Sequence, residues 1–344
     1  MSADARARVD VAVVGATGAV GEALLELLAE REFPVGRLHA LASARSAGST
    51  VMFRGRPVMV EDLAEFDFAG VGLALFSAGG SVSEAHAPRA AAAGCIVVDN
   101  TSKFRYDDDI PLVVPEVNGA EATRGSGGRI IANPNCSTMQ LVVALAPLHA
   151  AAGLERVRVS TYQAVSGAGR SGIEELASQT VALLNGRDAE RSVFPAQIAF
   201  NAVPHGGDFH DNGYTNEEMK ITWETRKILG EPELAVSATS VRVPVFHGHS
   251  EAVSIELRDA LSAAEARELL AAAPGVTVVD EHAVGGYPTA VTHAAGTDPV
   301  FVGRIREDIA HPRGLNLWVV SDNLRKGAAL NSVQIGELLL KELR

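Results

Sequence analysis

The first third of the chain alternates short apolar runs with segments of helical periodicity. Val9–Val14 is rich in β-branched residues and ends at a glycine, which is typical of a buried strand. Gly21–Arg31 carries four leucines on one face and predicts an amphipathic helix. The alternation continues with predicted strands Leu38–Ala42, Pro57–Val60, Val71–Phe76 and Cys95–Asp99 and a helix over Glu84–Ala93. Continuous apolar strands separated by helices predict a parallel sheet covered on both faces, a Rossmann-type doubly wound α/β domain.

The pattern changes after Ile131. We predict helices over Cys136–Ala151, Ile173–Leu184 and Ser262–Ala273, and strands at Val157–Val165, Ala235–Val245, Glu251–Leu257, Val276–Asp280, Val300–Ile305 and Asn316–Val320. These elements predict a second, α+β domain with a mixed sheet. Apolar residues recur at helical spacing over Lys326–Leu340, and we expect this terminal helix to return to the first domain.

Composition and charge exclude several classes of protein. Hydrophobic residues make up 47% of the 344 residues, too many for a disordered chain. The net charge of −12 repels phosphate backbones, so we expect no nucleic-acid partner. The longest apolar runs, such as Leu141–Leu148, are too short to span a membrane, and no apolar signal segment precedes the first strand. Two cysteines, Cys95 and Cys136, are too few for a disulfide framework and predict reduced thiols in a cytoplasmic protein.

A glycine-rich turn follows the first strand. In VAVVGATGAVG, Gly15, Gly18 and Gly21 come after the strand and open the helix. Glycines at such places permit a tight turn, close approach of a pyrophosphate and close helix–strand packing, and a helix N-terminus attracts the anion. The spacing is GxxGxxG rather than GxGxxG, so a plain glycine turn in an α/β domain is the alternative.

The end of the second predicted strand carries no acidic residue. A carboxylate there would bind the ribose hydroxyls of NAD. The segment instead offers Arg45, with Ser43 and Ser46, which can bind a 2′-phosphate through charge-assisted hydrogen bonds. This favours NADP, and a solvated loop arginine is the alternative.

The strongest chemical signal is IANPNCSTMQ at 131–140. Asn133-Pro134 breaks a strand, and Cys136 then lies in the first turn of an apolar helix. The positive end of a helix stabilises a nucleophilic thiolate. Asn135 and the Cys136 backbone N–H are candidate oxyanion donors. Spacing alone would equally suit a small buried cysteine, which is how we interpret Cys95 in its apolar strand.

Taken together, these motifs resemble the aspartate-β-semialdehyde dehydrogenase family. GATGAVG, SAGGS at 77–81, NPNCST at 133–138, YQAVSGAG at 162–169, NEEMK at 216–220 and RVPVFHGHSEA at 242–252 occur in that family's order over essentially the whole chain. The resemblance implies NADPH-dependent reduction of L-4-aspartyl phosphate to L-aspartate 4-semialdehyde and phosphate, within lysine, diaminopimelate, threonine, methionine and isoleucine biosynthesis. It implies a homodimer, with a dinucleotide-binding domain at 1–132, a catalytic and dimerisation domain at 133–322, and a helix at 323–344 packing on the first domain.

Two other functions stay open at this point. One is another acyl-phosphate reductase, such as N-acetyl-γ-glutamyl-phosphate reductase, on the same scaffold. The other is a dinucleotide-binding regulator without catalysis, which the presence of both Cys136 and His249 disfavours.

The resemblance also assigns roles to particular residues. Cys136 would form a thioester and His249 would act as the acid/base, although His247 lies two residues away and would share its strand face. Gln163 would orient the substrate, Glu217 would lie near its amino group, and Arg242 would hold its carboxylate by paired hydrogen bonds.

Further positions match the anion-binding and cofactor-binding residues of the family. Arg105 and Lys220 would bind phosphate, with Asn100 and Lys103 nearby. The expected dinucleotide contacts are Gly15, Thr17, Gly18, Ala19, Val20, Arg45, Ser46, Ser166, Gly167 and Asn323. We assign no metal, because His205 and His210 lack a second ligand at metal spacing.

Overall fold

The computed structural model describes residues 8–124 and 129–340. Residues 1–7, for which the sequence predicts no signal peptide, lie outside the described residues, as do the last four residues of the predicted terminal domain. The chain forms two compact units, one of Met1–Pro134 with Ala328–Arg344 and one of Asn135–Gly327. Each unit has its own sheet.

The sheet of the first unit has the strand order β3-β4-β2-β1-β5-β6-β7. Its strands are β1 (Val9–Val14), β2 (Val35–Ala42), β3 (Thr50–Phe53), β4 (Arg56–Asp62), β5 (Leu73–Phe76), β6 (Ile96–Asp99) and β7 (Ile130–Ala132). All neighbours pair in parallel except β3, which pairs antiparallel with β4 at the edge. The order reverses between β1 and β5, so the predicted doubly wound topology is confirmed, with its switch point where β1 ends.

Helices cover this sheet because its strands are apolar on both faces. The unit contains α1 (Ala19–Glu30), α2 (Gly80–Ala92), α3 (Pro115–Asn118), α4 (Glu121–Arg124) and α9 (Leu330–Leu339). Leu24 and Leu28 of α1 share one core with Val333 and Ile335 of α9. The terminal helix therefore belongs to the first unit, as predicted, although a five-residue π-helical turn at Arg325–Ala329 precedes it.

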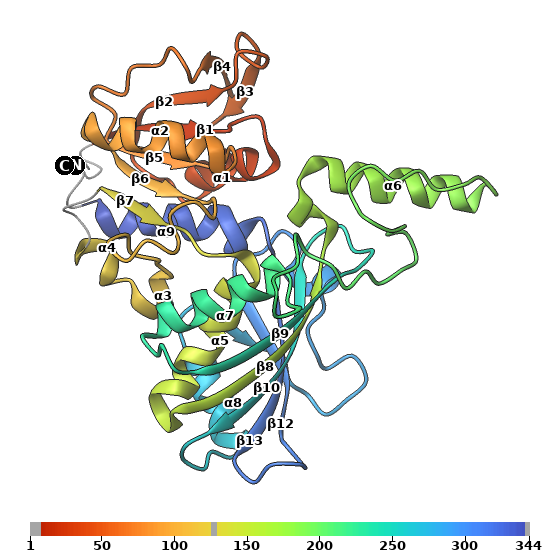
Figure 1. Ribbon diagram of the computed structural model, residues 1–344. Coiled ribbons are helices and arrows are strands. Elements are labelled where there is room, and N and C mark those ends of the chain that lie inside the picture. The colour runs from red at the N-terminus through yellow and green to blue at the C-terminus, as the bar shows by residue number, and fades with distance from the viewer. Residues whose placement is uncertain (1–7, 125–128, 341–344) are drawn as a thin grey trace. The chain divides into compact units, whose positions relative to one another are not determined.

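The second unit is built on a mixed sheet with the order β11-β12-β13-β10-β8-β9 (Figure 1). Its strands are β8 (Leu154–Gln163), β9 (Ala235–Arg242), β10 (His249–Leu257), β11 (Val276–Val278), β12 (Val300–Glu307) and β13 (Gly314–Ser321). The pairs β8–β9 and β11–β12 are parallel, and the others are antiparallel. The mixed sheet predicted for this part of the chain is confirmed.

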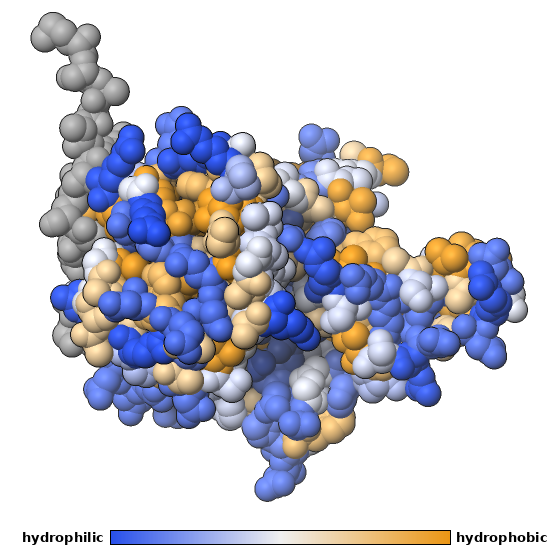
Figure 2. All heavy atoms as spheres, turned by 90° about the horizontal axis from the view of Figure 1, so that it is seen from above, coloured by the Kyte–Doolittle hydropathy of each residue, from blue (hydrophilic) through white to orange (hydrophobic). Residues whose placement is uncertain are grey.

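Three helices pack on one face of the mixed sheet and a fourth extends from it. The packed helices are α5 (Cys136–Ala152), α7 (Asn216–Leu229) and α8 (Ala263–Ala272). The fourth, α6 (Arg170–Leu184), follows a 3₁₀ turn, η1, at Val165–Ala168. Val181 and Leu184 are exposed, and Figure 2 shows apolar and hydrophilic side chains together on the part of the surface that α6 forms.

Several predicted boundaries were wrong for identifiable reasons. The strand predicted to reach Val165 ends at Gln163, because the chain turns into η1. The strand predicted to reach Val245 ends at Arg242, shortly before Pro244, which cannot donate to a sheet. The helix α7 was not predicted as an element because its sequence is polar. It is defined instead by a capping box between Thr215 and Glu218 and by Gly230 in the left-handed region at its end.

Candidate active site

The glycine-rich turn of the first unit forms a cradle that only glycine fits. Gly15 has φ +88°, and a Cβ at Gly21 would lie 2.1 Å from the Gly15 carbonyl oxygen. Gly18 is the N-cap of α1, and no side chain caps the helix there. Ala19 and Val20 lie in the first turn of α1, where backbone amides lack partners within the helix and can bind an anion, and Thr17 directly precedes the N-cap. This geometry fits the pyrophosphate of a dinucleotide.

The loop after β2 carries Arg45 and Ser46. Arg45 is exposed. The Ser46 N–H donates to the Ser43 carbonyl at 2.8 Å, which closes a turn beside the strand next to β1. The loop presents a guanidinium and hydroxyl groups where an NAD site would present a carboxylate.

The residues after β6 hold Arg105 in place. Asp99 is buried and accepts hydrogen bonds from the Ser83 and Thr101 hydroxyls, both at 2.7 Å. The buried Arg105 donates from Nη2 to the Asn100 carbonyl at 2.8 Å. Lys103 pairs with Glu84 at 2.6 Å. Arg105 belongs to the first unit and Lys220 to the second.

Cys136 begins α5 in the second unit. Asn135 is the N-cap, and its side-chain oxygen accepts from the N–H groups of Ser137 at 3.0 Å and Thr138 at 3.4 Å. The Cys136 Sγ lies 3.2 Å from Nε2 of His249. A Cβ at Gly327 would lie 2.9 Å from the Cys136 Cβ, so this chain segment packs directly against the cysteine. A thiol at a helix N-terminus beside an imidazole is suited to nucleophilic catalysis.

His249 is fully buried at the first position of β10. Its Nδ1 accepts the Ala164 N–H at 3.0 Å. Burial lowers the pKa of His249 to about 3, the positive charge of Arg242 adds to this, and Glu217 opposes it. His247 was expected to share a strand face with His249, and this was wrong, because β10 begins at His249 and Gly248 before it has φ +89°.

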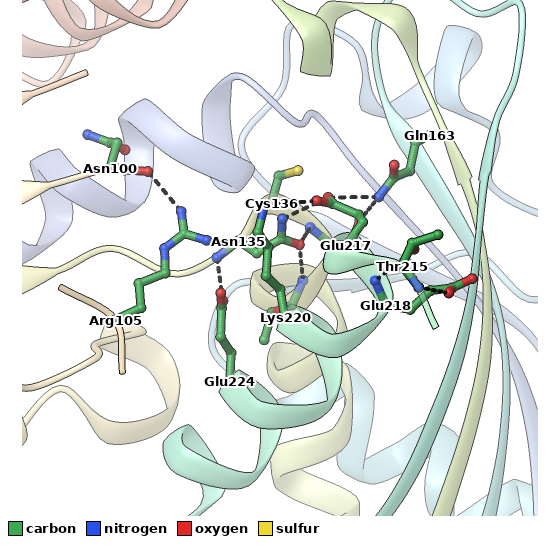
Figure 3. Close-up of polar contacts among 12 residues, drawn as sticks. Asn100, Arg105, Asn135, Cys136, Gln163, Thr215, Glu217, Glu218, Lys220 and Glu224 are labelled. Atoms are coloured by element: carbon green, nitrogen blue, oxygen red, sulfur yellow. Dashed lines mark hydrogen bonds and ion pairs between the residues drawn. The ribbon is translucent and has the colours of Figure 1, made fainter. Parts of the chain in front are cut away.

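Glu217 joins three other predicted residues in one network (Figure 3). Its Oε1 accepts from Asn135 Nδ2 at 2.8 Å and Gln163 Nε2 at 3.2 Å, and its Oε2 pairs with Lys220 Nζ at 3.3 Å. Burial opposes ionisation of Glu217, but Lys220, Asn135 and Arg242 outweigh it and lower its pKa to about 2. The site therefore holds a carboxylate near the nucleophile, matched by cations.

Glu224 was missed by the sequence analysis. It is fully buried, and its Oε2 accepts the Asn135 backbone N–H at 2.6 Å. The sequence signal for Glu224 was its distance along the chain from two predicted residues. Glu217, Lys220 and Glu224 are separated by three and then four residues, so they lie on one face of α7. The two amide groups of Asn135 both donate to carboxylates here, and its part as an oxyanion donor stays a prediction.

Arg242 and the loop of Ser166 and Gly167 lie beside His249. Arg242 pairs with Gln163 in the register of β8 and β9, and its Nη1 donates to the Ala164 carbonyl at 2.7 Å. A Cβ at Gly167 would lie 2.7 Å from that Nη1 and 3.4 Å from the His249 ring, so a side chain there would fill the space beside both.

Asn323 holds this loop to the strand that carries His249. Its Nδ2 donates to the Ser166 hydroxyl at 2.9 Å, and its Oδ1 accepts the Gly248 N–H at 2.9 Å. Because Asn323 is buried, these contacts position the loop and the histidine together.

Two negative findings concern the described residues only. Over 8–124 and 129–340, no three His, Cys, Asp or Glu side chains are grouped to hold a metal ion. Within the same ranges, no helix has the length and apolar character needed to cross a membrane.

Comparison with known proteins identifies the family. Residues 10–125 match the semialdehyde dehydrogenase NAD-binding domain, and residues 145–326 match the semialdehyde dehydrogenase dimerisation domain. Aspartate-semialdehyde dehydrogenase of Legionella pneumophila is 60% identical over 97% of this chain and 96% of its own length.

Solved structures agree with this match. Aspartate semialdehyde dehydrogenase II of Vibrio cholerae, complexed with ASA, is 54% identical with a TM-score of 0.95, covering 97% of this chain and 99% of its own. The Candida albicans enzyme with NADP is 27% identical with a TM-score of 0.77, covering 98% and 100%. The chain is therefore a dinucleotide-binding oxidoreductase that acts on small molecules, and it belongs to the aspartate-semialdehyde dehydrogenase family.

Proposed function

We propose that this enzyme reduces L-4-aspartyl phosphate to L-aspartate 4-semialdehyde and phosphate, and runs the phosphorylating oxidation in reverse. The observation that carries the proposal is the 3.2 Å approach of Cys136 Sγ to His249 Nε2 at the start of α5. The product would serve lysine, diaminopimelate, threonine, methionine and isoleucine biosynthesis, in the cytoplasm.

Cys136 is the nucleophile of this proposal. Its thiolate attacks the acyl carbon, the C–O bond to phosphate breaks, and a thioester forms. The bound dinucleotide supplies the hydride that reduces the acyl group to the aldehyde. His249, whose Nε2 lies 3.2 Å from the sulfur, would act as the acid/base, and Asn135 with the start of α5 would supply donors for negative charge on the substrate oxygen.

Substrate recognition would use opposite charges. Arg242 suits the substrate carboxylate, because a guanidinium forms paired hydrogen bonds with it. The ionised Glu217 suits the ammonium group, and Gln163, which also donates to the Ser137 hydroxyl at 2.8 Å, orients the acyl group. Lys220 and Arg105 would bind the phosphate. These charges select an amino-acid end and disfavour an N-acylated substrate.

NADP is the dinucleotide that we propose. Gly15, Thr17, Gly18, Ala19 and Val20 would hold its pyrophosphate, and Arg45 and Ser46 would bind the 2′-phosphate. Ser166 and Gly167 would lie near the nicotinamide, with Asn323 positioning them. The NADP-bound Candida albicans relative supports this preference.

We also propose a homodimer, divided into the domains 1–132, 133–322 and 323–344. The match to a dimerisation domain supports this assembly. So do the exposed Val181 and Leu184 of α6 and the exposed Tyr162, whose ring lies tilted against that of Trp318 with the ring centroids 5.5 Å apart. Sedimentation of the purified chain would give its mass in solution, and a monomer would contradict the proposal.

The deciding experiment follows NADPH formation from aspartate semialdehyde with and without inorganic phosphate. We expect formation only when phosphate is present, because phosphate must release the thioester. Equal rates without phosphate would indicate hydrolysis of the thioester and a different reaction.

A further inference from the structure

The connection between α6 and α7 is fastened to α6 by two buried side chains. Residues 190–206, which we call the connecting segment, run back from the end of α6 toward the mixed sheet (Figure 1). Glu175 and Gln179 lie one turn apart on α6, and both are buried. Their polar atoms face the connecting segment and bind its backbone.

The Glu175 carboxylate accepts hydrogen bonds from three consecutive residues. Its Oε2 accepts from the Ser192 N–H and the Ser192 hydroxyl, both at 2.9 Å, and from the Val193 N–H. Its Oε1 accepts the Phe194 N–H at 3.4 Å. Burial raises the pKa of Glu175, but these hydrogen bonds outweigh burial and lower it, so the group is ionised at neutral pH. An ionised carboxylate only accepts, which matches this row of donors.

Gln179 fastens the connecting segment at further points. Its Nε2 donates to the Glu190 carbonyl at 2.8 Å and to Oε1 of Glu175 at 3.0 Å. Its Oε1 accepts the N–H groups of Ile198 at 2.9 Å and Ala199 at 3.1 Å. Both polar atoms of the Gln179 amide therefore hold the connecting segment, directly or through Glu175.

The fastened segment packs against the 3₁₀ turn η1. Phe194 and Ile198 share a buried apolar cluster with Val165, the first residue of η1. The same turn contains Ser166 and Gly167, which we propose to lie near the nicotinamide. The connecting segment therefore supports this turn through apolar contacts.

The end of the connecting segment reaches both charged residues that we propose to bind the substrate. Val203 and Arg242 exchange two backbone hydrogen bonds, at 2.9 and 2.8 Å. The Glu217 N–H donates to the Gly206 carbonyl at 3.0 Å, and a Cβ at Gly206 would lie 2.8 Å from the Glu217 Cβ. The backbone positions of Arg242 and Glu217 therefore both depend on where this segment lies.

Resting on the proposed function, we propose that Glu175 and Gln179 are positioning residues for substrate binding. By fixing the connecting segment, they set the separation between the Arg242 guanidinium and the Glu217 carboxylate. That separation selects a substrate that carries a carboxylate and an ammonium group on one carbon. Because Arg242 and Glu217 would hold this end of the substrate before and during the reaction, losing their alignment raises KM more than it lowers kcat.

The first test compares Glu175→Gln and Gln179→Leu with the wild type in the oxidation of aspartate semialdehyde with phosphate. Glu175→Gln turns an amide N–H toward backbone N–H groups, and Gln179→Leu removes both polar atoms. We expect KM for aspartate semialdehyde to rise about 10- to 100-fold, with kcat within about threefold of wild type. Kd for NADP should stay unchanged, because Arg45 and the glycine-rich turn belong to the other unit. An unchanged KM in both variants would overturn the proposal.

Asp280→Asn is the matched control for a general loss of stability. The Asp280 side chain is also a buried carboxylate that holds chain segments together, because it pairs with Arg267 at 2.6 Å and accepts the Ile305 N–H at 3.2 Å. None of these three residues is proposed to bind substrate. We expect this variant to unfold at lower urea concentration and to keep KM unchanged. A rise in KM equal to that of Glu175→Gln would show that stability, not position, is responsible.

Hydrogen exchange tests the proposal in the wild-type enzyme, whether or not the variants fold. If order in the connecting segment raises the affinity for substrate, then substrate must stabilise that order by the same factor. We therefore expect saturating aspartate semialdehyde to slow exchange at the Val203, Ile198 and Arg242 amides by about 10-fold or more. Unchanged exchange at these amides would overturn the proposal.

The proposed function and the positioning proposal fail in different ways. A wild-type enzyme that does not oxidise aspartate semialdehyde with phosphate would overturn the proposed function. An active wild-type enzyme whose KM is the same in Glu175→Gln and Gln179→Leu would overturn only the positioning of Arg242 and Glu217.

Discussion

At the scale of single residues, the two cysteines show how the surroundings of a thiol determine its reactivity. Cys95 is fully buried, its Sγ donates to the Phe68 carbonyl, and burial raises its pKa to about 11. Cys136 is partly exposed at a helix N-terminus beside an imidazole. Only the second environment favours a nucleophile.

We therefore expect Cys136→Ser to fold and bind NADP but to lose turnover by more than about 10³-fold, because a hydroxyl is far less acidic than a thiol. Cys95→Ser is the matched control and should keep turnover while losing about 1 kcal/mol of unfolding free energy. Steady-state assays and urea denaturation measure these effects. Inactivation by thiol reagents through Cys95 would contradict the assignment.

We expect the proposed preference for NADP to depend on the exposed side chain of Arg45. Arg45→Asp removes a cation from the 2′-phosphate position and adds repulsion, while a carboxylate there accepts hydrogen bonds from the NAD ribose. We expect kcat/KM for NADP to fall about 10- to 100-fold, the range of a lost charge-assisted hydrogen bond. If the ratio between NADP and NAD stays constant in the variant, Ser43 or Ser46 becomes the candidate.

At the scale of elements, the cap of α7 controls a site residue. Thr215 accepts from the Glu218 N–H, Glu218 accepts from the Thr215 N–H at 2.7 Å, and Glu217 lies in the same first turn. We expect Thr215→Ala to cost about 1 kcal/mol of unfolding free energy and to lower kcat/KM, because fraying displaces Glu217.

The helix α8 supplies the control for this prediction. Ser262 and Glu265 form the same capping box there, in a helix that carries none of the proposed site residues. Ser262→Ala should lower the unfolding free energy by a similar amount and leave kcat/KM unchanged. Equal kinetic losses in the two variants would show that global stability, not the position of Glu217, is responsible.

At the scale of the whole molecule, one buried carboxyl group should govern how stability depends on pH. Glu251 is fully buried two residues after His249, and its hydrogen bond with the side chain of Gln140 lowers its pKa less than burial raises it. Burial raises its pKa well above 4.5, so the folded protein keeps this proton while the unfolded chain loses it. The free energy of unfolding is then greatest below the pKa that Glu251 has in the unfolded chain. It falls as the pH rises toward the pKa that Glu251 has in the folded protein, by about 1.4 kcal/mol for each unit between the two pKa values.

Glu251→Gln removes this ionisation and keeps a neutral polar side chain opposite Thr161. We expect the variant to unfold at higher denaturant concentration than wild type at pH 7, with the difference vanishing near pH 4. Glu256→Gln on the same strand is the opposite case, because the hydrogen bond from Arg158 lowers the pKa of Glu256. The Glu256→Gln variant loses this carboxylate and should therefore be less stable than the wild type at pH 7. Parallel pH profiles for wild type and Glu251→Gln would refute the assignment.

The local features of this protein were determined by its sequence. Strand and helix periodicity predicted most elements of both sheets, because burial on one or two faces sets the spacing of apolar residues. The cradle at Gly15–Gly21 and the helix start at Cys136 were also predicted, since each depends on a few adjacent residues. The polar α7 was not, because its hydrogen-bonded cap and its packing define it rather than an apolar stripe.

Only the tertiary structure decided the chemistry that links distant residues. Cys136 and His249 are 113 positions apart, and the register of β10 and the turn at Gly248 bring His249, and not His247, to the sulfur. The lowered pKa values of His249 and Glu217 follow from burial and from neighbours such as Lys220 and Arg242. Such contacts depend on how strands pair and helices pack, so they could not be predicted from the order of residues along the chain.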